Sequence, residues 1–475
     1  MRLPFRLLLS VLALCLAGPA LAAEAGAPHL DGGELSALWS LPFAGILLSI
    51  AVFPLVAPQF WHHHFGKVSL FWALAVLLPF VIEFGFALML YELIHVLLLE
   101  YLPFIILLFA LFTVAGGVRI TGALRGTPGV NTAMLALGTV LASIMGTTGA
   151  AMLLIRPMLR ANDWRQRKVH VFIFFIFLVA NIGGSLTPLG DPPLFLGFLK
   201  GVDFFWPTEH MLPPMLLVAL PLLAIFYALD RWLHRREPVP ETAEHIETDE
   251  SRFGIEGRWN LLLLIGILGA VLLSGFWKSE IELTVYHVPR QLEGLVRDGL
   301  LVAIAFLSMR LTPAESRRAN SFTWFPIIEV AKLFAGIFIT IFPVIGMLRA
   351  GEEGALGGVV GAVSADDGTA INSAYFWITG ILSSFLDNAP TYLVFFNTAG
   401  GDPGYLMGES ADTLLAISAG AVFMGANTYI GNAPNFMVRS ICEERGVKMP
   451  SFFGFMLWSV GILMPLFVLV TLLFF

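Results

Sequence analysis

The 475-residue chain has little charge and almost no cysteine. Charged residues make up 13% of it and hydrophobic residues 57%, a balance that excludes a soluble globular protein. Its two cysteines, Cys15 and Cys442, cannot form a disulfide framework. No Cys/His cluster has metal-ligand spacing, and neither a glycine-rich phosphate loop nor a nucleophile elbow occurs. We therefore expect no enzymatic activity, no resident cofactor or metal and no nucleic-acid partner.

What the chain has instead is a series of apolar segments of about 20 residues, long enough to cross a lipid bilayer as helices. The sequence predicts an all-α polytopic membrane protein. In the first half these segments lie near 37–58, 68–90, 101–118, 130–158, 169–199 and 211–233. In the second half they lie near 259–277, 295–309, 325–348, 372–399, 412–441 and 452–475.

Two segments lie outside these apolar runs. Residues 1–22 carry Arg2 and Arg6, a short apolar run and small residues before Ala23, the layout of a cleaved secretory signal peptide. The alternative is an uncleaved first membrane helix, but the apolar run is short for a span. Residues 234–258 are polar, acidic and proline-bearing, and they read as a cytoplasmic linker.

Polar motifs interrupt four of the apolar segments. The motif at 143–150 matches the one at 384–391, and the motif at 184–194 matches the one at 425–435. Both matches have the same offset of 241 positions, which indicates an internal duplication. The repeats are predicted to cover 37–233 and 259–475.

The placement of Lys and Arg predicts the topology. If 130–158 and 372–399 are re-entrant hairpins, each repeat has five transmembrane helices, one of them broken. Five is odd, so the second repeat must be inverted relative to the first. The loops then predicted to lie outside hold only Lys200, Lys278, Arg290, Arg297 and Arg349, as the positive-inside rule expects. We expect a bacterial inner-membrane protein whose mature N-terminus and C-terminus are periplasmic.

Paired helix breaks in inverted repeats are typical of secondary transporters, in which freed carbonyl oxygens bind cations near the bilayer midplane. Glycine and proline mark the breaks here, at Gly190, Pro192, Pro193, Gly431 and Pro434. A proline kink can also serve packing alone. Breaks that recur in two matched pairs favour the transport interpretation.

Two acids lie within the interrupted segments, Asp387 in the second hairpin and Asp191 in the first broken span. Intramembrane acids are expensive, and an ion or proton site is the first hypothesis for them. The alternative is a carboxylate that caps a half-helix. We expect Asp387 to be the shared cation and proton acceptor, with Asp191 assisting.

Neutral oxygens near these acids suit a hard cation such as Na⁺, although each could instead satisfy local backbone. They belong to Thr147, Thr148, Thr187, Asn388, Thr391, Asn427, Thr428 and Asn432. Three further charged residues are candidates for a gate or proton relay. Glu83 lies in an apolar run without an evident partner. Glu329 and Lys332 lie one helical turn apart, where an ordinary interfacial pair is the alternative.

The motifs at 183–193, 386–390 and 425–435 resemble those of the ion transporter superfamily, which includes sodium:proton antiporters, citrate and dicarboxylate carriers and arsenite permeases. The likeness spans nearly the whole chain after the signal segment. It is greatest to the branch of citrate transporters and sodium:proton antiporters. The resemblance implies that hairpins and broken helices form a mobile transport domain, and that a scaffold dimerises and supports elevator-type movement.

The hairpin tips differ from the Ser-Asn-Thr of sodium-dicarboxylate carriers, because they read Gly146-Thr-Thr148 and Leu386-Asp-Asn388. A carboxylate at a tip would repel a carboxylate substrate unless a cation neutralised it. We therefore predict exchange of Na⁺ or Li⁺ for H⁺, with cation-coupled citrate or dicarboxylate transport as the alternative. Small cations and the lipid bilayer are the expected partners, and a homodimer the expected assembly.

Overall fold

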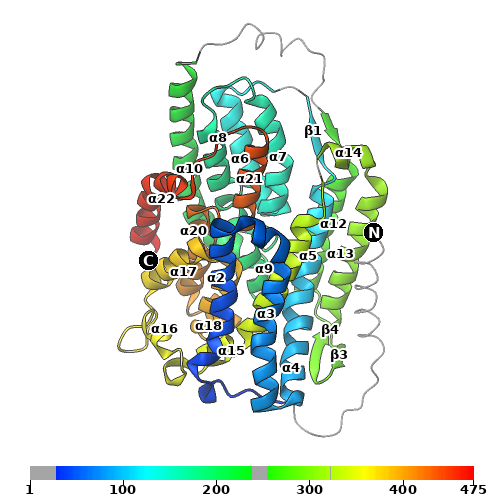
Figure 1. Cartoon of the computed structure of the whole chain (residues 1–475), viewed down its shortest axis with the longest axis vertical. Coiled ribbons are helices and arrows are strands. Elements are labelled where there is room, and N and C mark those ends of the chain that lie inside the picture. The colour runs from blue at the N-terminus through cyan, green and yellow to red at the C-terminus, as the bar shows by residue number, and fades with distance from the viewer. Residues whose placement is uncertain (1–27, 123, 238–253, 321) are drawn as a thin grey trace.

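A computed structural model describes residues 28–122, 124–237, 254–320 and 322–475. The predicted signal segment and most of the predicted linker lie outside these residues. Helices dominate and run along the long axis of the molecule (Figure 1). Nine helices of the described residues are long and apolar enough to cross a membrane. The predicted all-α polytopic membrane protein is confirmed.

The first half begins with two short 3-10 turns, η1 (Gly32–Glu34) and η2 (Ala37–Ser40), followed by a series of helices. These are α2 (Leu41–Val56), α3 (Pro58–Phe84), α4 (Phe86–Val96), the π-helical turn η3 (Leu97–Tyr101) and α5 (Leu102–Ala115). The first hairpin is α6 (Pro128–Met145) and α7 (Thr147–Ala161). The first broken helix is α8 (Val169–Leu178), η4 (Ile182–Leu186) and α9 (Pro192–Leu199), and α10 (Trp206–His234) ends this half.

The second half follows the same plan. It contains α12 (Trp259–Phe276), α13 (Leu292–Leu311), α14 (Ala314–Ala319), α15 (Phe325–Arg349), η6 (Gly351–Glu353) and α16 (Gly357–Gly361). Its hairpin is α17 (Asn372–Phe385) and α18 (Asn388–Thr398), followed by α19 (Pro403–Met407). Its broken helix is α20 (Ala411–Met424), η7 (Gly425–Asn427) and α21 (Ala433–Glu444), and α22 (Phe452–Phe474) is last.

Short antiparallel strand pairs lie at the two ends of the molecule (Figure 1). At one end, β1 (Arg119–Thr121) of the first half pairs with β2 (Gly254–Glu256), which precedes α12. At the other end, β3 (Glu282–Val285) and β4 (Val288–Gln291) form a hairpin between α12 and α13. The first pair connects the two halves of the chain.

The structure corrects the predicted boundary between the second and third spans. We expected separate spans at 68–90 and 101–118, with a loop at 91–100 between them. The chain instead turns at Gly85, whose φ of +86° suits glycine, and then continues as helix through this segment. The polar side chains there are half-buried or buried against protein, so they do not mark a loop.

The helices pack into two units. In one, α3 packs on α2 and α15, and α13 packs on α5 and α12. In the other, the hairpins pack on the broken helices, with α17 on α20, α6 on α7 and η4, and α18 on α9. We call these the α3–α15 unit and the hairpin unit. The hairpin unit reaches further than α2 and α3 toward the end of the molecule that carries β1 (Figure 1).

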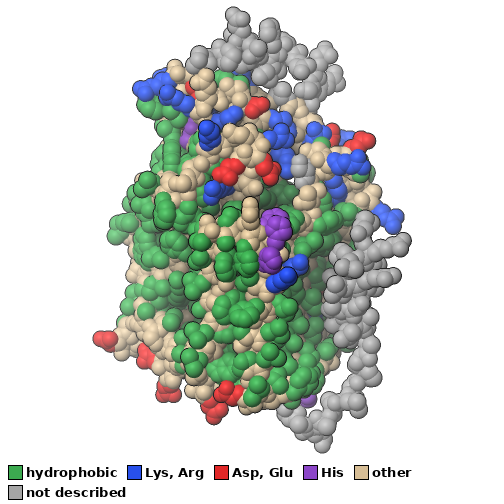
Figure 2. All heavy atoms as spheres, viewed as in Figure 1, with side chains coloured by type: hydrophobic (Ala, Val, Ile, Leu, Met, Phe, Trp, Pro, Cys, Tyr) green, Lys and Arg blue, Asp and Glu red, His purple; other side chains and the backbone are tan. Residues whose placement is uncertain are grey.

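Charged side chains gather at the ends of the molecule and leave a hydrophobic belt between them. Lys and Arg crowd the end that carries β1, whereas Asp and Glu stand out at the opposite end (Figure 2). The positive-inside rule predicts that the end with Lys and Arg faces the cytoplasm, and the names of the two ends follow this prediction. We call that end the cytoplasmic end and its opposite the outer end.

Candidate functional site

The Asp191 carboxylate is the point where all four interrupted segments meet. Thr147 Oγ1, at the start of α7, donates to Asp191 Oδ1 at 3.0 Å. Asn432 Nδ2, just before α21, donates to the same oxygen at 3.1 Å. Asn388 Nδ2, at the start of α18, donates to Asp191 Oδ2. All four side chains are buried, and within the described residues these three hydrogen bonds are the contacts made to the carboxylate.

These four residues are two matched pairs of the duplication. Asp191 corresponds to Asn432, and Thr147 corresponds to Asn388, each at the offset of 241 positions. Three of the four positions therefore carry a neutral amide or hydroxyl, and one carries the acid. The N-termini of α7, α9, α18 and α21 all begin at or next to these residues. Helix N-termini carry partial positive charge, which favours an anionic group at this point.

The backbone around the breaks is held by contacts that recur at the same offset. Thr187 Oγ1 donates to the Ser143 carbonyl, and Thr428 Oγ1 donates to the Ser384 carbonyl. Each hydroxyl thus ties the second break of its half to the hairpin. Thr187 and Thr428 serve the local backbone, which is the alternative that the sequence left open.

Glycine at the breaks is required by a close backbone approach. A Cβ atom on Gly190 would lie 2.1 Å from the Gly184 carbonyl oxygen. A Cβ atom on Gly431, the matched residue, would lie 2.6 Å from the Gly425 carbonyl oxygen. Pro192, Pro193 and Pro434 then begin the next half-helix, where proline is tolerated because the first amides have no helical partner. These glycines and prolines thus lie where the two helices are interrupted.

Asp387 has a different environment from Asp191. It is the N-cap of α18, and its Oδ1 accepts from the Ala389 amide at 3.1 Å. It is half-buried, and the hydrogen bonds found for the described residues give its side chain no partner in another segment. The geometry therefore gives Asp387 the capping role that the sequence allowed, and it gives Asp191 the central position.

Two amide oxygens near the breaks are buried without a hydrogen-bond partner. They are Asn388 Oδ1 and Asn427 Oδ1. The amide nitrogen of Asn388 is used by Asp191, and that of Asn427 donates to Ser384 Oγ at 2.9 Å. A buried acceptor without a donor is costly, and a bound cation would satisfy it. Asn388 Oδ1 belongs to the same amide group whose nitrogen donates to Asp191. A cation bound there is therefore close enough to contact both side chains.

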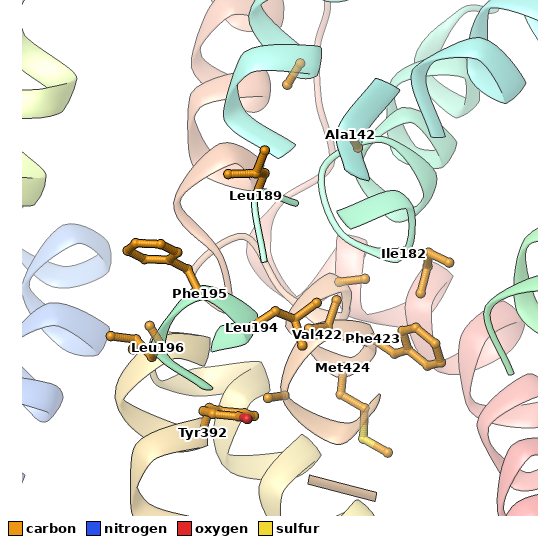
Figure 3. Packing of buried hydrophobic residues seen from close by; sticks show 14 of the residues in the cluster. Ala142, Ile182, Leu189, Leu194, Phe195, Leu196, Tyr392, Val422, Phe423 and Met424 are labelled. Carbon is orange, nitrogen blue, oxygen red and sulfur yellow. The ribbon is translucent and has the colours of Figure 1, made fainter. Parts of the chain in front are cut away.

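Apolar side chains surround the breaks and exclude water from them. Figure 3 shows Leu194 of the first broken helix next to Val422 of the second, with Leu189 and Phe195 on one side of this contact and Phe423 on the other. All five are buried. In such surroundings the effective dielectric constant is low, which strengthens the attraction between a carboxylate and a cation.

Two other predicted site residues, Thr391 and Thr148, are not among the described residues that contact Asp191. Thr391 Oγ1 donates to the Asp387 carbonyl at 2.9 Å, a bond within its own helix. Thr148 is half-buried in the first turn of α7. Neither one touches the Asp191 carboxylate among the contacts of the described residues.

The candidate gate or relay residues are Glu83, Glu329 and Lys332. Glu83 is exposed in the last turn of α3, two residues before the Gly85 turn, so it is not deep in a span. Glu329 and Lys332 form no ion pair within the described residues. The Lys332 ammonium lies instead 5.4 Å from the centroid of the Phe65 ring. A gate or relay role for these three residues stays a prediction.

Sequence reasoning missed two asparagines that support the site. Asn181 Nδ2 donates to Asn435 Oδ1 at 2.7 Å, which joins the two broken helices. Asn435 Nδ2 in turn donates to the Gly425 and Thr428 carbonyls, both at 2.8 Å. The position of Asn181 in a wholly apolar run was a signal that could have found it.

A buried ionic cluster at the cytoplasmic end was also missed. Arg165 forms ion pairs with Asp230 of α10 and with Glu237, and His170 Nε2 lies 2.8 Å from Asp230 Oδ1. Asn131 Nδ2 of α6 donates to Asp230 Oδ2 at 3.0 Å. The cluster ties the first hairpin to α8 and α10.

An all-α membrane protein whose broken helices converge on one buried carboxylate is a membrane transporter. The chain belongs to a family of transporters described as "Putative citrate transport", whose model matches residues 32–475. It is 25% identical over 370 residues to an uncharacterized transporter of Mycobacterium bovis, covering 74% of this chain and 80% of the relative. It is 24% identical over 326 residues to a 46 kDa membrane protein of Mycobacterium leprae, covering 68% and 70%. The description of the family and the name of the Mycobacterium bovis relative both indicate a transporter.

Proposed function

We propose that the protein exchanges Na⁺ or Li⁺ for H⁺ at Asp191. The observation that carries this proposal is the convergence of Thr147, Asn388 and Asn432 on one buried carboxylate. Every neighbour in that set can offer an oxygen, and no Lys or Arg neutralises the acid among the hydrogen bonds and ion pairs of the described residues. An acid without a basic partner is suited to a cation or a proton.

The carboxylate makes the two ions exclude each other. When Asp191 is ionised, its charge attracts the cation, and Asn388 Oδ1 and freed backbone carbonyls supply further oxygen ligands. When Asp191 binds a proton, the charge that attracts the cation is gone. One site therefore carries either ion but not both, as antiport requires. Apparent sodium affinity should rise with pH as protons leave the site.

The two halves are proposed to be inverted repeats that move as an elevator. In support, the hairpin α6–α7 opens to the cytoplasmic end and α17–α18 to the outer end (Figure 1). The hairpin unit packs on the α3–α15 unit through α18 against α15 and α7 against α5, and the α3–α15 unit would be the scaffold and the dimerisation surface. We take this conformation to be the inward-facing one, on the ground that the hairpin unit extends beyond α2 and α3 at the cytoplasmic end (Figure 1).

Cation-coupled citrate or dicarboxylate transport is the second candidate. The description of the family favours it. So do the four half-helix N-termini at the site, because backbone amides there can hold carboxylate groups. A citrate anion would still need a bound cation to offset its repulsion from Asp191.

Purified protein in liposomes distinguishes the two functions. Lumenal pH is recorded after a sodium pulse, with and without external citrate, and uptake of labelled citrate is measured in parallel. Exchange predicts lumenal alkalinisation that needs sodium and not citrate. Citrate uptake without a pH response to sodium would replace the proposal with the second candidate. Liposomes with Asp191→Asn protein control for leak.

A further inference from the structure

Lys200 is one of the few cations predicted to lie on the outer side, and it forms a largely buried ion pair. It caps the C-terminal end of α9 and pairs with Glu100 of the π-helical turn η3. Its side chain is 16% exposed and that of Glu100 is 6% exposed. A pair so far out of water is maintained only where its geometry is good, because both charges lose hydration.

This pair crosses the boundary between the two packed units. Lys200 belongs to the hairpin unit, since α9 packs on α18. A Cβ atom on Gly197 of α9 would lie 2.4 Å from Tyr392 Oη of α18, and Figure 3 shows Tyr392 below Leu196 of α9. Glu100 belongs to the α3–α15 unit, because η3 continues into α5 and contacts α15. A sliding movement of one unit along the other must therefore separate Lys200 from Glu100.

A second acid, Glu92, lies on the same side of this helix. Residues eight apart in an α-helix point about 80° away from each other. The π-helical turn at Leu97–Tyr101 accommodates one extra residue, which reduces the difference to about 20°. Glu92 is half-buried and has no ion pair within the described residues. The charges of Glu100 and Arg349 act on it, and those of Glu100 and Lys200 act on His95 between them.

The direction of the helices places Glu92 on the path that Lys200 would follow. Helix α4 starts at the outer end and runs toward the cytoplasmic end, so Glu92 lies outward of Glu100 (Figure 1). Their separation along the axis is about 12 Å at 1.5 Å per residue. Movement of the hairpin unit from an inward-facing to an outward-facing position carries Lys200 toward Glu92.

We propose that Glu100 and Glu92 are successive partners of Lys200, one for each position of the hairpin unit. The proposal rests on the elevator movement in the proposed function, but not on which substrate is carried. Without Glu92, the outward position would leave a partly buried ammonium group unpaired, which is costly. Glu100 Oε2 is buried without a hydrogen-bond partner, so the present contact is not fully satisfied and is easier to break.

Arg349 and Asn397 provide the neighbouring contact across the same boundary. Arg349 Nε, at the end of α15, donates to Asn397 Oδ1 of α18 at 3.0 Å. This bond is between a charged and a neutral group, so separating it leaves one unpaired charge near water rather than two buried ones. Lys200 and Glu100 are therefore the pair whose separation most needs a substitute partner.

Cysteine cross-linking tests the two positions directly. In protein with Cys15→Ser and Cys442→Ser, Lys200→Cys is combined with Glu100→Cys, Glu92→Cys or Leu93→Cys. A short bis-methanethiosulfonate is added to proteoliposomes, and linked peptides are quantified by mass spectrometry. We expect linking to positions 100 and 92, and none to 93, which has nearly the same depth but a different face. Linking to 100 alone would overturn the second position.

A charge variant tests whether Glu92 pairs with Lys200 rather than merely lying near it. Glu92→Gln should lower the rate of substrate turnover about tenfold, the effect of losing one charge-assisted contact in one state. Sodium binding, measured by the sodium-dependent shift in melting temperature, should be unchanged. Turnover at the native rate in Glu92→Gln would overturn the pairing. Cross-linking needs no substrate, so a failure of sodium–proton exchange would leave its result intact.

Discussion

Replacing Asp191 by Asn removes the charge at the centre of the site and keeps the size of the side chain. The amide retains one oxygen that can accept from Thr147 or Asn432. Asparagine also occupies the matched position 432 in the second half, so the local backbone accommodates it. The variant should therefore fold and reach the membrane.

The expected loss of cation affinity follows from the attraction between unit charges. A cation about 4 Å from the carboxylate gains about 4 kcal/mol at an effective dielectric constant of 20. Losing this term weakens binding about 700-fold, since each 1.4 kcal/mol is a factor of ten. Proton exchange should be lost as well, because the amide cannot ionise.

Two measurements check this prediction. The first is the sodium concentration that gives half of the maximal pH response in liposomes. The second is the melting temperature with and without sodium, because a ligand stabilises only the state that binds it. Asp387→Asn is the matched control, since Asn caps a helix as well as Asp does. Full exchange by Asp191→Asn together with loss of exchange in Asp387→Asn would refute the reasoning and return the leading role to Asp387.

Three further predictions concern the breaks, the cytoplasmic cluster and the topology. Gly190→Ala should abolish transport and lower the melting temperature, because its Cβ atom would lie 2.1 Å from a backbone oxygen; a native melting curve would contradict this. Arg165→Gln should destabilise the protein by about 3–5 kcal/mol, since it removes the buried cation that pairs with both Asp230 and Glu237, whereas exposed Arg167→Gln should not change stability in denaturant melts. In intact cells, an impermeant maleimide should label a single cysteine placed at Gly404, which is predicted to lie outside. It should not label one placed at Asp163, which is predicted to face the cytoplasm, and the opposite pattern would invert the topology.

The helix breaks could be predicted because a repeated motif at a fixed offset can be found in the sequence without any knowledge of the structure. Matching motifs at 241 positions located both hairpins and both broken helices, and Gly190 and Gly431 lie at backbone contacts as expected. The positions of the turns were harder to predict from the sequence. Glu92 and Glu100 resemble loop residues by polarity, but they face protein on a continuous helix.

The relative roles of Asp191 and Asp387 could not be predicted from the sequence. Both acids lie next to a helix break and within apolar flanks. The two acids differ in the groups that donate hydrogen bonds to their carboxylates. The partners of Asp191 come from segments 44, 197 and 241 positions away, and only the packed structure brings them together. Asp387 is contacted by an amide two residues away, a pattern common to many capping residues.

The unequal pair of Asp191 and Asn432 has a consequence for the electrical behaviour of transport. A strict repeat would place two acids at the centre, and two nearby carboxylates either share a proton or need two cations. With Asp191 as the single acid that exchanges its ion, one monovalent cation outward and one proton inward leave the same net charge in the moving unit. Such exchange carries no current. We therefore expect its rate to be insensitive to a potassium–valinomycin diffusion potential and to follow only the two ion gradients.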